Sequence, residues 1–324
     1  ARAGHARALA GALTKGATAT TVFPTTTAAA LATLTTGALP GEHGMVGYSV
    51  LDRDQGRVVN QLNGWDEGMD PATWQPLPTV FERAAALGVP SFAIGEPRFE
   101  TSGFTAAVLR GAEYVPHKQV PDRFQAARAI LDRADRGILY LYIAELDKVA
   151  HSSGWESPDW TERLEVLDAE VGRLAASLRA DEGMLVTADH GILDVPPEAH
   201  LKIDTAPDLL DGVRLVAGEP RCLQLHLEPG ADAAAVVERW RQAEGGRAWV
   251  ASRDEVIESG WFGPVVTDAA RSRMGDVFVA ARKRVVYDDP RTASPQSQAM
   301  IGQHGSLSDE ELTVPLLRFG AFRK

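Results

Sequence analysis

The chain of 324 residues contains a single cysteine, Cys222, and therefore cannot form a disulfide within itself. A zinc site made of several thiolates is excluded for the same reason. Cationic residues are also few: 33 lysines and arginines face 44 aspartates and glutamates, which gives a formal net charge of −11. This balance argues against a protein that binds duplex nucleic acid through a general positive field. A small anionic substrate stays compatible, because a metal ion or a helix terminus can reverse the charge locally.

Long apolar runs are absent as well. The sequence has no run of 18 apolar residues and no basic segment followed by an apolar one, so it predicts neither a membrane span nor a signal peptide. We therefore expect a cytoplasmic protein. With 44% hydrophobic and 24% charged residues, the chain is long enough for one large α/β domain or two smaller ones.

Apolar runs typical of strands alternate with segments of helical periodicity. Residues 137–147 (GILYLYIAELD) and 183–191 (GMLVTADHG) are near-continuous apolar runs of the kind found in buried parallel strands. Between them, residues 159–180 repeat leucine and valine at helical spacing. This strand–helix–strand order predicts an α/β fold with a mostly parallel sheet and helices on both faces.

Residues 200–288 have a different pattern. The segment 221–228 (RCLQLHLE) alternates apolar and polar residues, and a helical segment around 231–243 follows it. We expect a smaller α+β cap or insertion here. The α/β core would then comprise residues 1–199 and 289–324.

Five acidic and histidine side chains follow the strand-like segments: Asp147, His151, Asp189, His190 and His304. Ligands of open parallel sheets bind at the carboxyl ends of the strands, so these groups could converge on one cleft. Carboxylates and imidazoles without thiols suit zinc or a similar divalent ion. Five ligands exceed the usual three of one catalytic zinc, which favours two divalent ions about 4 Å apart.

Each of these groups alone has a simpler interpretation. Asp147 and His151 have the spacing of a surface pair on a helix, and Asp189–His190 before a glycine suits a turn. Only their combination, in this element context, makes a metal centre the better hypothesis.

Thr27 is the candidate nucleophile. It precedes a helical segment that ends at Gly37, so it can be the N-cap residue, where backbone N–H groups and the helix dipole favour negative charge. An alkoxide and the phosphate that it attacks would both be stabilised there. The alternative is that Thr25, Thr26 and Thr27 serve only as cap and turn residues.

These motifs together resemble the alkaline phosphatase superfamily, and within it the type I phosphodiesterase/nucleotide pyrophosphatase family. The segment PTTTAAALATLTTGALPGEHG (24–44) is similar to the family's nucleophile motif, which assigns the nucleophile to Thr27. The family's D-x-x-G-H element matches Asp147 and His151, with Ala150 in place of the glycine. Its D-H-G element and its later H-G element match at Asp189–His190–Gly191 and His304–Gly305.

The resemblance implies two metal sites. One would be held by Asp147, His151 and His304. The other would be held by Asp189, His190, Thr27 and one further aspartate at the end of a strand upstream of the nucleophile. Residues 1–26 contain neither aspartate nor glutamate, so we expect that strand to precede Ala1; the alternative is an incomplete site. The family usually has a phosphoryl-binding asparagine where this sequence has Tyr48, whose phenol can donate one hydrogen bond.

The expected function is a two-zinc phosphodiesterase acting on a small, nucleotide-like phosphate ester through a covalent phosphothreonine. Alternatives are a phosphomonoesterase or phosphonate hydrolase of the same superfamily, and a catalytically inert relative that binds metal or phosphate. A monoester carries more charge, so an arginine near Thr27 would favour it, with Arg98 and Arg221 as candidates. The sequence makes no prediction of the oligomeric state.

Overall fold

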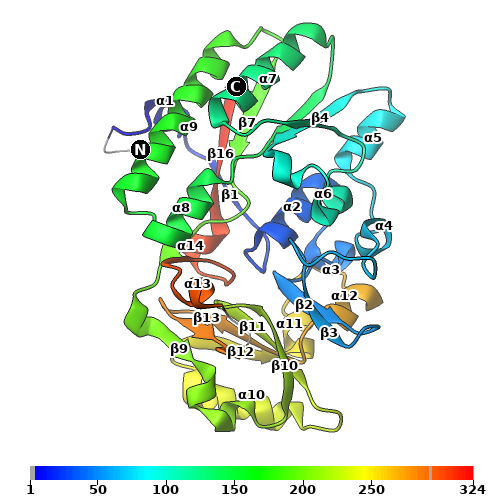
Figure 1. Cartoon of the computed structure of the whole chain (residues 1–324), viewed down its shortest axis with the longest axis vertical. Coiled ribbons are helices and arrows are strands. Elements are labelled where there is room, and N and C mark those ends of the chain that lie inside the picture. The colour runs from blue at the N-terminus through cyan, green and yellow to red at the C-terminus, as the bar shows by residue number, and fades with distance from the viewer. Residues whose placement is uncertain (1–3, 292–293, 324) are drawn as a thin grey trace.

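The computed structural model describes residues 4–291 and 294–323. The molecule has two lobes (Figure 1), and the first contains two three-stranded sheets. The first sheet has the order β5–β4–β6, and both of its ladders are parallel. Its strands are β4 (Ser91–Gly95), β5 (Glu113–Pro116) and β6 (Ile138–Leu141). The second has the order β1–β16–β7 with antiparallel ladders. Its strands are β1 (Thr18–Thr20), β7 (Gly183–Thr187) and β16 (Thr313–Gly320).

The α/β class is as predicted, but the mostly parallel sheet is not confirmed. The last strand, β16, lies between β1 and β7 and runs opposite to both. Apolar runs show that a strand is buried but not its direction, which is why the sequence did not reveal this return. β6 and β7 are each paired on one side only within the described residues, and Ile138 and Leu185 are 38% and 52% exposed.

Helices cover these sheets on two sides. Figure 1 shows α8 and α9 to the left of the strands and α2, α5 and α6 to the right. The bounds of the helices of this lobe are α1 (Arg7–Gly11), α2 (Thr27–Thr36), α3 (Pro40–His43), α4 (Pro71–Trp74), α5 (Val80–Ala86), α6 (Gly103–Val108), α7 (Val120–Arg133), α8 (Glu145–Ser153), α9 (Pro158–Ser177), α13 (Pro295–Gln298) and α14 (Asp309–Leu312). Phe92, Phe124, Leu174 and Phe319 belong to one buried cluster that joins strands of both sheets to α7 and α9.

A second lobe lies at the lower end of the molecule in Figure 1. Its antiparallel sheet has the order β10–β11–β13–β12. Its elements are β10 (Val213–Glu219), β11 (Cys222–Leu227), β12 (Ala248–Ser252), β13 (Val277–Ala281), α10 (Ala233–Glu244), α11 (Arg253–Glu258) and α12 (Asp268–Arg273). Shorter strands are β2 (Ser49–Asp52), β3 (Arg57–Asn60), β8 (Leu193–Asp194), β9 (His200–Lys202), β14 (Val286–Asp288) and β15 (Gly302–Gln303). The proposed boundaries of the cap, 200–288, stay a prediction.

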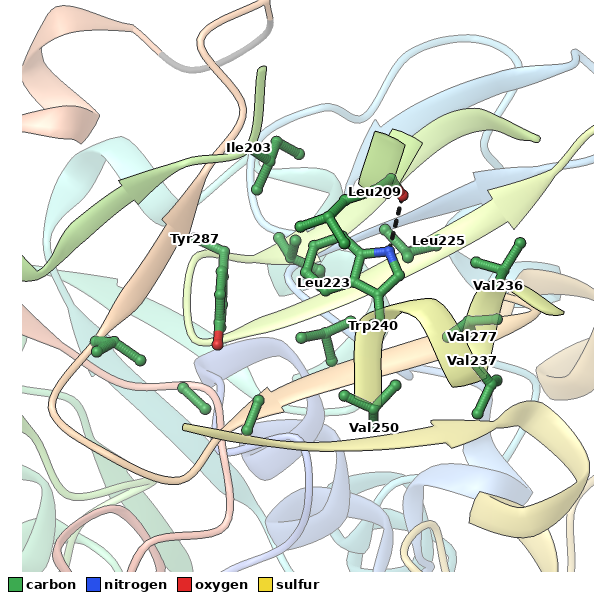
Figure 2. Packing of buried hydrophobic residues seen from close by; sticks show 14 residues of the cluster. Ile203, Leu209, Leu223, Leu225, Val236, Val237, Trp240, Val250, Val277 and Tyr287 are labelled. Carbon is green, nitrogen blue, oxygen red and sulfur yellow. Dashed lines mark hydrogen bonds between the residues drawn. The ribbon is translucent and has the colours of Figure 1, made fainter. Parts of the chain in front are cut away.

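One buried cluster of this lobe lies between α10 and one face of the sheet, and a second covers the other face of β11 and β13. Figure 2 shows Trp240 of α10 packed among Leu223, Leu225 and Val250, with its indole Nε1–H donating to the Leu209 carbonyl at 2.9 Å. Burying an indole requires such a partner for its N–H group. The alternation predicted for 221–228 is thereby explained, because its leucines face α10. Within the described residues, no helix has the length and apolar character needed to cross a membrane.

Candidate active site

The candidate nucleophile begins helix α2. Thr26 has an extended backbone (φ −129°, ψ 146°) and is the N-cap residue, whereas Thr27 is the first helical residue. This corrects the prediction of Thr27 as the N-cap by one position. Gly37 ends the helix in the left-handed conformation at φ 73°, as the sequence suggested. Thr26 makes no capping bond through its side chain, so the N–H groups of the first turn stay available to an anion.

The three consecutive threonines have different surroundings. Thr25 is buried; its hydroxyl donates to the Ser306 carbonyl at 2.9 Å and accepts from the Gly305 N–H at 2.9 Å. Thr26 is also buried. Thr27 is partly exposed, and its Oγ1 lies 3.2 Å from Nε2 of His190. Of the three hydroxyls, that of Thr27 is therefore the one placed beside the histidine cluster.

Asp147, His151 and His304 lie together, as predicted. One ligand atom from each lies within 4.8 Å of the others. His151 Nε2 is 3.4 Å from Asp147 Oδ2, and His304 Nε2 is 3.9 Å from Asp147 Oδ1. Asp147 does not end a strand, however. The strand expected over 137–147 ends at Leu141, and Asp147 lies in the first turn of α8, where the helix dipole favours a carboxylate.

Asp189 and His190 follow β7 and adjoin the same cluster. His190 Nε2 lies 3.5 Å from Asp189 Oδ2. The rings of His190 and His304 stack with their centroids 3.6 Å apart and their planes at 17°. The stacked rings join this pair to the group around Asp147. Within the part of the chain that the structure describes, the Asp147 group is the one set of three close metal-ligand side chains.

All three histidines are oriented by the protein backbone. In each, Nδ1 lies within hydrogen-bonding distance of a carbonyl oxygen, and the three pairs are His151 with Gly302 at 2.7 Å, His304 with Thr25 at 2.7 Å and His190 with Gly191 at 2.9 Å. A carbonyl only accepts, so Nδ1 carries a proton in each ring, and Nε2 has a lone pair whenever the ring is neutral. Three such lone pairs converge with carboxylate oxygens, an arrangement that a cation between them stabilises.

The charge state of this cluster also suits a cation. Asp147 Oδ1 is buried and has no hydrogen-bond partner within the described residues. Burial alone would raise the pKa of Asp147, but the imidazoles of His151 and His304 hold it well below its ordinary value. Burial, together with the neighbouring His190, lowers the pKa of His304 well below its usual range. Asp147, in contrast, raises the pKa of His151 against the effect of burial, so a cation at this position would compete with the proton on that ring. A carboxylate and imidazole nitrogens are the donors that zinc prefers, so the residues present fit a divalent metal.

A buried ion pair supports the loop that carries His304. Arg221 and Glu311 are fully buried and form two hydrogen bonds of 2.8 Å. Glu311 also accepts from the N–H of Ser306 at 2.8 Å and from the hydroxyl of Ser308 at 2.6 Å. The sequence offered only the S-x-x-E spacing of a capping box here, which indicates a helix start and not a buried carboxylate.

We expect Arg221→Met to lower the free energy of unfolding by about 3–5 kcal/mol, because it leaves the Glu311 carboxylate buried and uncompensated. Urea denaturation measures the change. The matched control is Arg271→Met, which breaks the exposed pair with Asp254 and should cost less than about 1 kcal/mol. Equal losses in the two variants would contradict this account of the buried pair.

The remaining predicted site residues are not joined to the centre. Arg221 donates to Glu311 and to carbonyls of the second lobe, and Arg98 pairs with Glu96 and stacks over Phe99. Tyr48 is 36% exposed and precedes β2; among the described residues no hydrogen bond connects it to Thr27. Its role in binding phosphate stays a prediction.

A family model now identifies the class of protein. The model of type I phosphodiesterases/nucleotide pyrophosphatases matches residues 2–307, which is most of the chain. The chain therefore belongs to this family, within the alkaline phosphatase superfamily. The resemblance inferred from the four motifs is confirmed.

Individual relatives differ in the part of the chain that they match. A phosphopentomutase from Anaeromyxobacter dehalogenans (strain 2CP-C) is 29% identical over 119 residues, which are 36% of this chain and 28% of the relative. One from Kosmotoga olearia is 26% identical over 128 residues, 39% of this chain and 31% of the relative. The chain thus matches less than a third of the length of these curated relatives.

Solved structures match nearly all of the chain. Murine ectonucleotide pyrophosphatase/phosphodiesterase 5 matches with a TM-score of 0.72 at 18% identity. The match covers 93% of this chain and 78% of the murine chain. An inactive threonine-to-alanine variant of that protein was solved in complex with AMP. Phosphonoacetate hydrolase from Sinorhizobium meliloti 1021, in complex with phosphonoformate, matches with a TM-score of 0.73 at 18% identity. This match covers 98% of this chain and 84% of the hydrolase chain. At these identities the likeness establishes the α/β fold.

Proposed function

We propose that this chain is a metal-dependent phosphoric diester hydrolase that uses Thr27 as its nucleophile and acts on small, nucleotide-like substrates. The observation that carries the proposal is the backbone-oriented histidine cluster beside Thr27, in which three Nε2 lone pairs converge with two carboxylates. Membership of the family supports the reaction class. The AMP complex of the murine protein supports a nucleotide-like ligand.

Two groups of residues would hold the metals. Asp147, His151 and His304 would bind one divalent ion, most simply zinc, and Asp189 and His190 with the Thr27 hydroxyl would bind a second. When bound, such ions lower the pKa of a coordinated hydroxyl and neutralise the charge on the phosphoryl and leaving oxygens. The second group is one carboxylate short of three firm ligands, and the further aspartate implied by the family stays a prediction.

The chain's own groups divide the reaction into two displacements. Thr27 loses its proton to solvent, its Oγ attacks phosphorus, and the bond to the leaving oxygen breaks, which places the phosphoryl group on Thr27. The leaving oxygen takes up a proton. Water then attacks phosphorus, the bond to Thr27 Oγ breaks, and the phosphate monoester leaves while a proton returns to the Thr27 hydroxyl. The N–H groups at the start of α2 would bind the phosphoryl oxygens in both steps, since the side chain of Thr26 makes no capping bond to them.

Phosphonate or phosphomonoester hydrolysis is the second candidate. The likeness to phosphonoacetate hydrolase favours it. A dianionic monoester is less favoured, because Arg98 pairs with Glu96 and Arg221 pairs with Glu311. Neither arginine is thereby available to bind a phosphoryl group at Thr27. An additional cationic contact would be needed for the extra charge.

A comparison of three substrates separates these functions. We expect the zinc-loaded protein to have a higher kcat/KM for bis(p-nitrophenyl) phosphate than for p-nitrophenyl phosphate, by about tenfold or more, because Arg98 and Arg221 pair with Glu96 and Glu311 and do not compensate the second charge of the monoester. Phosphonoacetate is the third substrate. A higher kcat/KM for the monoester or for phosphonoacetate would replace our proposal with the second candidate, and no turnover of any of the three would favour an inert relative.

A further inference from the structure

A pocket of about 440 Å³ lies in the second lobe, between the β2–β3 hairpin and the ends of β10 and β11. Its charged lining residues include Arg53, Arg214, Glu228 and Asp276. The pocket contains none of the residues assigned above to nucleophile or metal. It is therefore separate from the candidate active site.

His226 of β11 is the unusual member of this pocket. The residue is 1% exposed, and neither ring nitrogen has a hydrogen-bond partner within the described residues. Leaving a buried polar group unpaired costs about 1–3 kcal/mol, so a hydrogen-bonding partner for the two ring nitrogens of His226 would be favourable. Burial and the surrounding arginines lower the pKa of His226 to about 4, against the opposing effect of the Asp276 carboxylate, so the ring is neutral at pH 7 and offers one donor and one acceptor.

The charges around His226 favour an anion. The carboxylate of Asp276 is already compensated, because it accepts from the Leu227 N–H at 2.9 Å and pairs with Arg253 at 3.0 Å. Arg53 uses its Nε to donate to the Ser272 carbonyl at 2.6 Å, and its terminal nitrogens form no ion pair within the described residues.

Arg214 is placed by an irregularity of the sheet. The register of β10 against β11 shifts between Val213 and Leu215, which pair with Leu227 and His226, so Arg214 is the extra residue of a bulge. Bulges redirect a side chain from the regular alternation of a strand. Here the redirected residue lines the pocket beside His226. The lining arginines Arg53 and Arg214 are balanced by the carboxylates of Glu228 and Asp276, and the Arg253 that pairs with Asp276 adds one further positive charge beside the pocket.

We propose that this pocket binds a small organic anion, with its oxyanion head between Arg53, Arg214 and the His226 ring. Leu51 and Leu227 provide an apolar wall for the body of the ligand. The neutral imidazole donates one hydrogen bond to the head, and the two guanidinium groups supply charge-assisted bonds. The pocket is large enough for a molecule of this kind.

The test uses the intact metal-loaded protein and phenylphosphonate as the probe, with the ring nitrogens of the histidines followed by NMR. We expect the His226 signals to shift saturably, and the affinity at this site to fall by about tenfold or more in the Arg53→Gln/Arg214→Gln variant. Signals of His151, His190 and His304 report separately on binding at the active site. His226→Gln assigns the signals of that residue.

Two controls accompany the titration. Arg136→Gln removes an exposed arginine outside the pocket and should leave the His226 titration unchanged. Sodium chloride at the same ionic strength should give no saturable shift. The proposal is overturned if phenylphosphonate does not move the His226 signals, if chloride moves them equally, or if the double arginine variant titrates like the parent.

Discussion

Replacing Thr27 with alanine should lower kcat/KM for an aryl phosphodiester by on the order of 10³-fold or more, because the substitution removes the attacking oxygen. Bound metal, measured by elemental analysis, should stay nearly unchanged, since the hydroxyl is only a minor ligand. Helix α2 should persist, because alanine is a good helix former at its first position.

Thr26→Ala and Thr25→Ala are the comparisons for this variant. Thr26 makes no side-chain capping bond, so its alanine variant should retain most of its turnover. The Thr25 hydroxyl forms hydrogen bonds with Ser306 and Gly305. Its alanine variant should therefore have a lower free energy of unfolding but still turn over the substrate. If Thr27→Ala keeps near-normal turnover while one of these abolishes it, the nucleophile has been assigned to the wrong threonine.

The second large effect concerns the metals. His304→Ala should lose about one metal ion per chain, and His190→Ala likewise, because the two histidines belong to different sets of ligands. Both variants should also lose most of their turnover. Elemental analysis of the zinc-loaded proteins gives the stoichiometry.

His5→Ala provides the matched control, since this exposed histidine pairs with Glu165 and belongs to neither set of metal ligands. Its metal content should equal that of the parent protein. Two bound metal ions per chain in both His304→Ala and His190→Ala would contradict the two-metal model. Loss of all metal from either one would mean that the two sites are not independent.

Much of the candidate site could be predicted from sequence because its residues stand in short motifs. Asp147 and His151 are one helical turn apart, and His190 directly follows Asp189, so local geometry already places each pair together. His304 was the harder case. It is distant from Asp147 in sequence, and no sequence pattern encodes the carbonyl contacts at Thr25 and Gly302 that orient the rings of His304 and His151.

The predictions made from sequence were wrong where tertiary contacts decide the bounds of a strand, its direction or the partner of a side chain. The apolar run at 137–147 contains both a strand and a helix start, and hydrophobicity does not mark the change at Leu141. The antiparallel β16 could not be told from a parallel strand, because both are apolar when buried. Arg221 was a candidate phosphate ligand by type, but it is fully buried against Glu311, a pairing between residues distant in sequence.

The most direct test of the central claim is to trap the covalent intermediate. The zinc-loaded protein is mixed with a bis(aryl) phosphodiester, quenched in acid within one turnover, digested, and fragmented in a mass spectrometer to locate any phosphoryl ester. The account predicts a phosphoester on Thr27 that is absent from the Thr27→Ala variant and that disappears once substrate is exhausted. A phosphoester on Thr25 or Thr26, or turnover during which no residue carries a phosphoester, would contradict it.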